Sequence, residues 1–252
     1  MDLEKEWKHY PVIRLDMSRG GANAGTLRSY LNLRFKAYET LSGITPDPTA
    51  RLAERFHGIL PAANKKTGLQ VAILIDEYDS PLQHSWKTPQ HDECTEVYRE
   101  VFAILKADDN YERFIFITGI TKFTQISLFS VLNNLSNISF DAPYAALCGI
   151  IKDEIKENFM PEITMMGEQN GWSTDETIEQ LQAYYDGYHF SRKNMVDVFN
   201  PFSLINALSD NELRNYWAAS GATSLLPKFV DDLDIRLKDF ENCALISSVI
   251  ET

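Results

Sequence analysis

The sequence predicts an α/β fold in which parallel strands alternate with helices. Two apolar runs, 71–75 and 114–117, lack the polar alternation of half-exposed strands, so each is expected to be buried on both faces. A helical pattern lies between them, which indicates a right-handed crossover joining neighbouring parallel strands. Beyond about residue 150 the pattern is helical throughout. We therefore expect a sheet-containing core over residues 1–150 and a helical lid or companion region over residues 151–252.

The first half of the chain also carries the signals of one more strand and two helices. A short strand is expected over residues 11–16, followed by a glycine-rich turn over residues 18–25. The next helix repeats apolar residues on one face and ends at Gly43, because glycine readily adopts the left-handed conformation at a helix C-terminus. A second helix is expected over about 49–64, before the apolar run at 71–75.

Local signals mark the elements that follow. Thr88 precedes a proline and is expected to cap a helix between the two buried strands, and residues 138–140 are expected to form a further strand. Ser173 begins a sequence with the spacing of a capping box, so it is expected to start a helix. Asn200, which also precedes a proline, is expected to begin another helix, and a last helix is expected over residues 224–230.

Composition restricts the class of protein. The chain of 252 residues has 24 Lys and Arg against 36 Asp and Glu, a net charge of −12, so general binding to nucleic-acid phosphates is not expected. Cys94, Cys148 and Cys243 are far apart, which argues against a zinc site or a disulfide framework. No apolar run has the roughly 18 residues of a membrane span, and the N-terminus has no apolar signal core. We expect a soluble, cytoplasmic protein.

Two adjacent carboxylates, Asp76 and Glu77, directly follow the apolar run at 71–75. They are expected to lie where the strand leaves the core, and ligands of open α/β sheets bind at the carboxyl ends of strands. P-loop enzymes that act on magnesium-nucleotides need such a pair, one carboxylate for the metal and one for the attacking water. Solvated or capping acids are the alternative interpretation, and we favour a capping role for Asp79, which precedes the turn before Pro81.

Seven segments of the chain, taken in order and spacing, resemble one family. The chain is similar to the bacterial AAA-ATPase-like family, a P-loop ATPase domain often fused to a C-terminal restriction-like nuclease domain. The similarity extends from residue 3 to about residue 230 and implies a P-loop NTPase-type sheet followed by a helical region. The segments are YPVIRLDMS, LQVAILIDEYDSPL, RFIFITGITKF, SLFSVLNNLSNISF, YYDGYHFS, FNPFSLINAL and NYWAASG.

The resemblance implies an ATP site that uses Mg²⁺. Asp76 and Glu77 match the Walker B carboxylates, with Asp76 holding the metal and Glu77 activating the attacking water as a catalytic residue. Thr118, at the end of the next strand, matches a polar sensor of the γ-phosphate and is the second catalytic candidate. Thr121 and Lys122 lie just beyond it and are implied on the cofactor-binding side of the site. ATP is the partner that the resemblance implies for the intact family.

The chain departs from the family in its phosphate loop. Family members begin with a strand and a glycine-rich loop ending in Gly-Lys-Ser, and no Gly-x-x-x-x-Gly-Lys-Ser or Gly-Lys-Thr occurs in this sequence. The phosphate cradle is therefore not encoded, as expected of an N-terminally truncated product or of a gene that lost this part. The first strand of the sheet would be missing with the loop, which leaves an unpaired edge and favours self-association. We likewise expect this chain to lack the nuclease domain.

The leading interpretation is an AAA-ATPase-like core fragment that carries the Walker B half of the site. We expect it to be inactive as an isolated chain, because the phosphate loop supplies most hydrogen-bond donors to the phosphates of ATP. The alternative is a non-catalytic interaction or regulatory module derived from such an ATPase. A metal-carboxylate nuclease built on Asp76, Glu77 and Asp79 ranks last, because the lysine that such sites usually place after the acids is missing.

Overall fold

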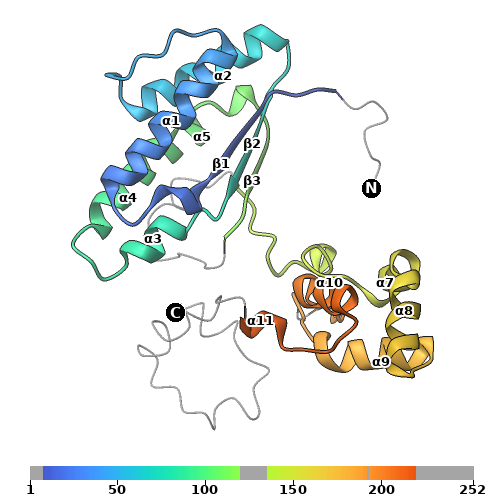
Figure 1. The fold of residues 1–252 in the computed structure, drawn as a ribbon. Coiled ribbons are helices and arrows are strands. Elements are labelled where there is room, and N and C mark those ends of the chain that lie inside the picture. Colours follow the sequence, from blue (N-terminus) through green and yellow to red (C-terminus); the bar gives the residue numbers. More distant parts are fainter. Residues whose placement is uncertain (1–7, 120–134, 192, 220–252) are drawn as a thin grey trace. The chain divides into compact units, whose positions relative to one another are not determined.

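The computed structural model describes residues 8–119, 135–191 and 193–219. These residues belong to two compact units, and the chain passes from the first to the second between Ser136 and Asn137 (Figure 1). The first unit holds a sheet with helices, and the second unit is helical, as the sequence predicts. Each unit is described by itself below.

The sheet of the first unit has three parallel strands in the order β1-β2-β3. They are β1 (Val12–Asp16), β2 (Val71–Asp76) and β3 (Glu112–Ile117). The α/β class, the parallel pairing and the adjacency of the two apolar strands are therefore confirmed. Parallel neighbours need a crossover, and helices occupy both connections in this sheet.

Helices pack on one face of this sheet, and Figure 1 shows α1, α2 and α4 on the same side of the strands. The strand residues that point toward these helices are fully buried in one apolar core, as Leu15, Ile73 and Ile75 illustrate. The elements between the strands are η1 (Met17–Gly20), α1 (Ala24–Ser42), α2 (Leu52–Thr67), α3 (Ser80–Ser85), α4 (His91–Phe102), α5 (Ile104–Ala107) and η2 (Asp109–Tyr111).

The opposite face of the sheet is only partly covered by the residues that the structure describes. Val12 is 49% exposed and Phe114 is 53% exposed, and the burial of β2 alternates between full and partial along the strand. The prediction of strands buried on both faces was therefore wrong for this part of the chain. The apolar residues on this face predicted a covering layer that the described helices do not provide. Phe114 stacks on Phe116 instead, with ring centroids 6.0 Å apart.

The edge of the sheet at β1 is closed by side chains of α1. The Tyr38 hydroxyl accepts a hydrogen bond from the Arg14 N–H at 2.7 Å and donates to the Arg14 carbonyl at 2.9 Å. The Tyr30 hydroxyl accepts from the Asp16 N–H at 2.8 Å. These bonds satisfy backbone groups that would otherwise offer a template for strand addition. In the described part of the chain, β3 forms the other edge.

Helix boundaries follow the predicted signals at several positions and differ at two. Gly43 ends α1 with a φ of 83°, as expected of a glycine C-cap, but α2 begins at Leu52 and not at Thr49. Thr88 does not cap α4, which begins at His91 after Gln90. The Thr88 hydroxyl donates to the Ser85 carbonyl at 2.6 Å, so it stabilises the turn that leaves α3.

The second unit consists of short helices around a separate apolar core, which includes Leu181, Phe199 and Leu204. The capping box at Ser173 is confirmed by reciprocal bonds with Glu176. Residues 138–140 do not form the predicted strand and lie in a loop and turn. The predicted helix at 224–230 lies outside the described residues. The elements are η3 (Ala142–Tyr144), α7 (Lys152–Asn158), α8 (Met160–Asn170), α9 (Thr174–Tyr185), α10 (Pro201–Asp210) and α11 (Tyr216–Ala219).

Candidate functional site

The carboxyl ends of β2 and β3 bring Asp76 and Thr118 together. The Thr118 hydroxyl donates to Asp76 Oδ1 at 2.6 Å, and Arg14 Nη2 lies 3.6 Å from Asp76 Oδ2. The Asp76 side chain remains 47% exposed. The prediction that these two residues share one edge of the sheet is confirmed, since parallel strands in register end together.

A second carboxylate, Asp16, is in register with Asp76 at the end of β1. Ser18 donates a hydrogen bond to Asp16 Oδ1 at 2.5 Å, and Arg19 Nε lies 3.1 Å from Asp16 Oδ2. The Ser18 hydrogen bond, reinforced by the positive charge of Arg19, lowers the pKa of Asp16. Asp16 is therefore ionised at neutral pH, and its charge is offset by a neighbouring arginine. Asp16 was not predicted from the sequence as a site residue.

Glu77, at the same edge of the sheet, has an unusual backbone conformation. Its φ is 47°, in the left-handed region that residues other than glycine rarely adopt. Its side chain is exposed, and no hydrogen bond or ion pair joins its carboxylate to any residue that the structure describes. The Glu77 carboxylate is therefore accessible to water at the sheet edge.

The turn after Glu77 is held from several sides. The Tyr98 hydroxyl of α4 donates to the Tyr78 carbonyl, and Gln83 Nε2 of α3 donates to Asp79 Oδ2 at 2.6 Å. Asp79 precedes α3 as predicted, but its side chain makes no cap bond to the helix backbone and is only 1% exposed. Its role in the described residues is to fix the turn through Gln83.

Thr121 and Lys122, the predicted cofactor-binding residues, lie outside the described residues. In ranges 8–119, 135–191 and 193–219, no group of three or more His, Cys, Asp and Glu side chains could hold a metal ion.

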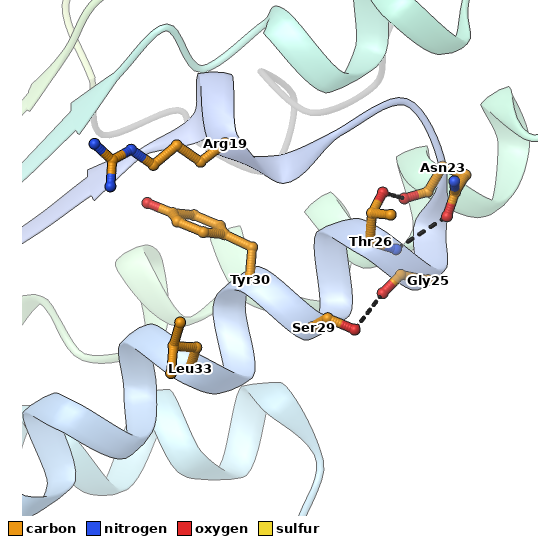
Figure 2. Close-up of a pocket in the computed structure, with 7 residues that line it drawn as sticks. All are labelled: Arg19, Asn23, Gly25, Thr26, Ser29, Tyr30 and Leu33. Carbon is orange, nitrogen blue, oxygen red and sulfur yellow. Dashed lines mark hydrogen bonds between the residues drawn. The ribbon is translucent and has the colours of Figure 1, made fainter.

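A shallow hollow of about 560 Å³ lies at the N-terminus of α1, next to the Asp16–Arg19 pair (Figure 2). Asn23 caps this helix by accepting a bond from the Thr26 N–H at 2.9 Å. The glycine-rich segment at 18–25 was the signal in the sequence for this turn. The lining residues are Arg19, Asn23, Gly25, Thr26, Ser29, Tyr30 and Leu33.

Replacing Gly119 by alanine is expected to destabilise the site. A Cβ there would lie 2.5 Å from the ring of Tyr78 and 2.7 Å from Asp79 Oδ1, and both side chains are buried. Overpacking of this kind costs about 1–3 kcal/mol of unfolding free energy. Denaturant unfolding of the variant measures it, with Gly58→Ala in α2 as the control, because the added Cβ has no atom nearer than 3.9 Å. Equal stability of the two variants would contradict the packing at Gly119.

Comparison with known proteins identifies the family. A family model described as "Predicted AAA-ATPase" matches residues 1–129. The chain belongs to this family of predicted AAA-ATPases. It is also 33% identical over 236 residues to an uncharacterised protein encoded in the vnfD 5′ region of Azotobacter chroococcum mcd 1. That match covers 90% of this chain and 41% of the relative, so the chain spans about two fifths of the length of that protein. No solved structure matches the chain.

The family match includes β1, β2 and β3 together with the whole carboxyl edge described above. This AAA-ATPase-like chain has no helix, among its described residues, that is long and apolar enough to cross a membrane.

Proposed function

We propose that the first unit carries the Walker B half of an ATPase site. The observation that carries this proposal is the hydrogen bond of 2.6 Å between the Thr118 hydroxyl and Asp76. It joins the ends of two neighbouring parallel strands at the edge where α/β sheets bind ligands. Glu77 follows directly, and its exposed carboxylate is bonded to no residue that the structure describes. Family membership supports nucleotide chemistry at this edge.

The residues present fit a magnesium-nucleotide. One oxygen of Asp76 is bonded by Thr118, and the other faces Arg14 and solvent, so the carboxylate can accept hydrogen bonds from metal-bound water. When bound, Mg²⁺ would offset the negative charge of the ATP phosphates and of the developing phosphate product. Asp76 would hold it, and the Thr118 hydroxyl would keep Asp76 in place.

Glu77 would act on water. Its carboxylate lies next to the metal-holding residue, and it is exposed and free of any cation among the described residues. It would accept a hydrogen bond from the water that attacks the γ-phosphate, orienting the water and taking its proton. The Thr118 hydroxyl, which bonds to Asp76, would also contact the γ-phosphate.

ATP binding by the chain as given is expected to be weak. Carboxylates repel phosphate unless a cation intervenes, and the sequence contains no Gly-Lys-Ser or Gly-Lys-Thr loop to supply backbone donors and a lysine. Among the described residues, the edge at β3 has no further strand paired to it, whereas side chains of α1 bond to the edge at β1. We propose that a strand carrying a phosphate loop completes the site at the β3 edge.

The test measures magnesium-dependent ATP binding and phosphate release with and without an added N-terminal strand and Gly-Lys-Ser loop of the family type. The extended protein is expected to bind and hydrolyse ATP. In it, Glu77→Gln should keep binding and lower turnover about 10²–10⁴-fold, because the amide keeps the shape and loses the base. Asp76→Ala should weaken magnesium-dependent binding itself.

Glu93→Gln is the matched control, since this exposed residue belongs to the first turn of α4 and not to a strand end, and its change should alter neither property. Turnover that survives Glu77→Gln would show that the chemistry lies elsewhere. An extended protein that binds no ATP would favour the alternative, a non-catalytic interaction module.

A further inference from the structure

Glu77 is an extra residue in the pairing between the ends of β2 and β3. The Thr118 N–H donates to the Ile75 carbonyl at 2.8 Å, and the Thr118 carbonyl accepts from the Tyr78 N–H at 2.9 Å. In an uninterrupted parallel ladder, the two partners of one residue are two positions apart, whereas Ile75 and Tyr78 are three apart. Asp76 and Glu77 therefore share the place opposite Thr118, which is a β-bulge of one residue.

The bulge places Glu77 in a strained backbone conformation. Glycine freely adopts the φ of 47° that Glu77 has, whereas a side chain makes this conformation unfavourable. In bulges that contain a left-handed residue, that residue is usually glycine. Among the described residues, no hydrogen bond or ion pair of the Glu77 carboxylate offsets this strain. A strained residue that the surrounding structure maintains is a reason to look for function.

The backbone N–H and the carbonyl of Tyr78, the residue after Glu77, are both hydrogen-bonded to residues outside the turn. Its N–H is bonded to the Thr118 carbonyl on β3, and its carbonyl accepts from the hydroxyl of Tyr98 on α4. Tyr98 is 1% exposed, and its ring stacks on Phe102 with centroids 5.2 Å apart. Because the ring is buried and packed, we expect its hydroxyl to hold the backbone directly after Glu77.

We propose that Tyr98 is a positioning residue for Glu77. Together with the backbone of Thr118, it holds the bulge closed, keeps Glu77 left-handed and leaves its carboxylate free at the sheet edge for an attacking water. The role of that carboxylate rests on the proposed function, whereas the hold of Tyr98 on Glu77 can be tested in the chain as it exists.

The test is a double-mutant cycle in thermal unfolding of the whole chain. Glu77→Gly is expected to raise Tm by about 2–4 °C over Glu77→Ala, because glycine relieves the strain and alanine does not. In a Tyr98→Phe background the bulge can relax, so the gain from Glu77→Gly should fall to less than half. A tyrosine that is merely structural would leave the two effects additive.

Tyr38→Phe is the matched control, because it also removes a buried hydroxyl that bonds to a strand backbone, on β1 and away from the bulge. The gain from Glu77→Gly should be unchanged in that background. Equal gains in the Tyr98→Phe and Tyr38→Phe backgrounds, or no gain of glycine over alanine, would overturn the proposal.

A second measurement uses the extended protein of the preceding section. Tyr98→Phe should lower its turnover number while the affinity for magnesium-ATP stays the same, and unchanged turnover would also overturn the positioning role. An extended protein without any turnover would contradict the proposed function alone, since the unfolding cycle still decides whether Tyr98 holds Glu77.

Discussion

Replacing Arg55 by alanine is expected to destabilise the first unit by about 3–5 kcal/mol, because it leaves a buried carboxylate without its partner. Arg55 of α2 donates from Nε and Nη2 to the two oxygens of Glu39 on α1, at 2.8 and 2.7 Å. The side chains of the pair are only 3% and 4% exposed. Asn32 receives further bonds from the same guanidinium, so each of its three nitrogens has a hydrogen-bond partner.

Urea unfolding or hydrogen exchange of the α1 and α2 amides measures this loss. The control is the double variant Glu39→Met with Arg55→Met, which removes both charges and fills the space with apolar side chains. The desolvation free energy of a buried ion pair is about as large as its electrostatic attraction, so removing both charges costs little. The double variant should therefore be clearly more stable than Arg55→Ala. A loss below about 1 kcal/mol in Arg55→Ala would be typical of an exposed pair and would contradict this burial.

The strands of the sheet could be predicted from the sequence because their signal is local. The apolar runs that become β2 and β3 are continuous, and a helical pattern separates them, so their parallel pairing follows from general rules of chain connection. The position of Asp76 next to Thr118 follows in turn, since residues that end neighbouring parallel strands share an edge.

Other features depend on contacts that no local pattern contains. The Arg55–Glu39 pair needs two helices to meet, and the sequence shows only two charges on separate amphipathic helices. The bulge at Glu77 depends on which carbonyl Thr118 bonds, and the sequence around it reads as a simple strand end. Thr88 had a local capping signal, but a competing bond to Ser85 places it in a turn.

Glu112 is expected to make the stability of the first unit depend on pH near neutrality. Burial, together with the negative charges of Asp108 and Asp109, raises the pKa of Glu112 from 4.5 to about 7. Its Oε1 atom is buried without a hydrogen-bond partner in the described structure. Asp108 is itself buried, and one of its carboxylate oxygens lies 2.7 Å from His57 Nδ1.

The raised pKa of Glu112 determines how the stability changes with pH. The folded state favours neutral Glu112, so the stabilising contribution is fully present below the unfolded pKa of about 4.5 and is lost as pH rises through about 7. Glu112→Gln removes the titration and keeps the shape. It should therefore match the parent protein at low pH and exceed its stability above pH 7, by at most about 3 kcal/mol.

Unfolding free energies of both proteins between pH 5 and pH 8.5 measure the difference. Glu96→Gln is the control, because this exposed residue of α4 forms only a surface pair with Arg99 and should leave the pH profile parallel to that of the parent. A Glu112→Gln profile that also stays parallel to the parent would mean that Glu112 is charged in the folded protein. Its buried oxygen would then have a partner, and the charge of Asp108 would not reach it.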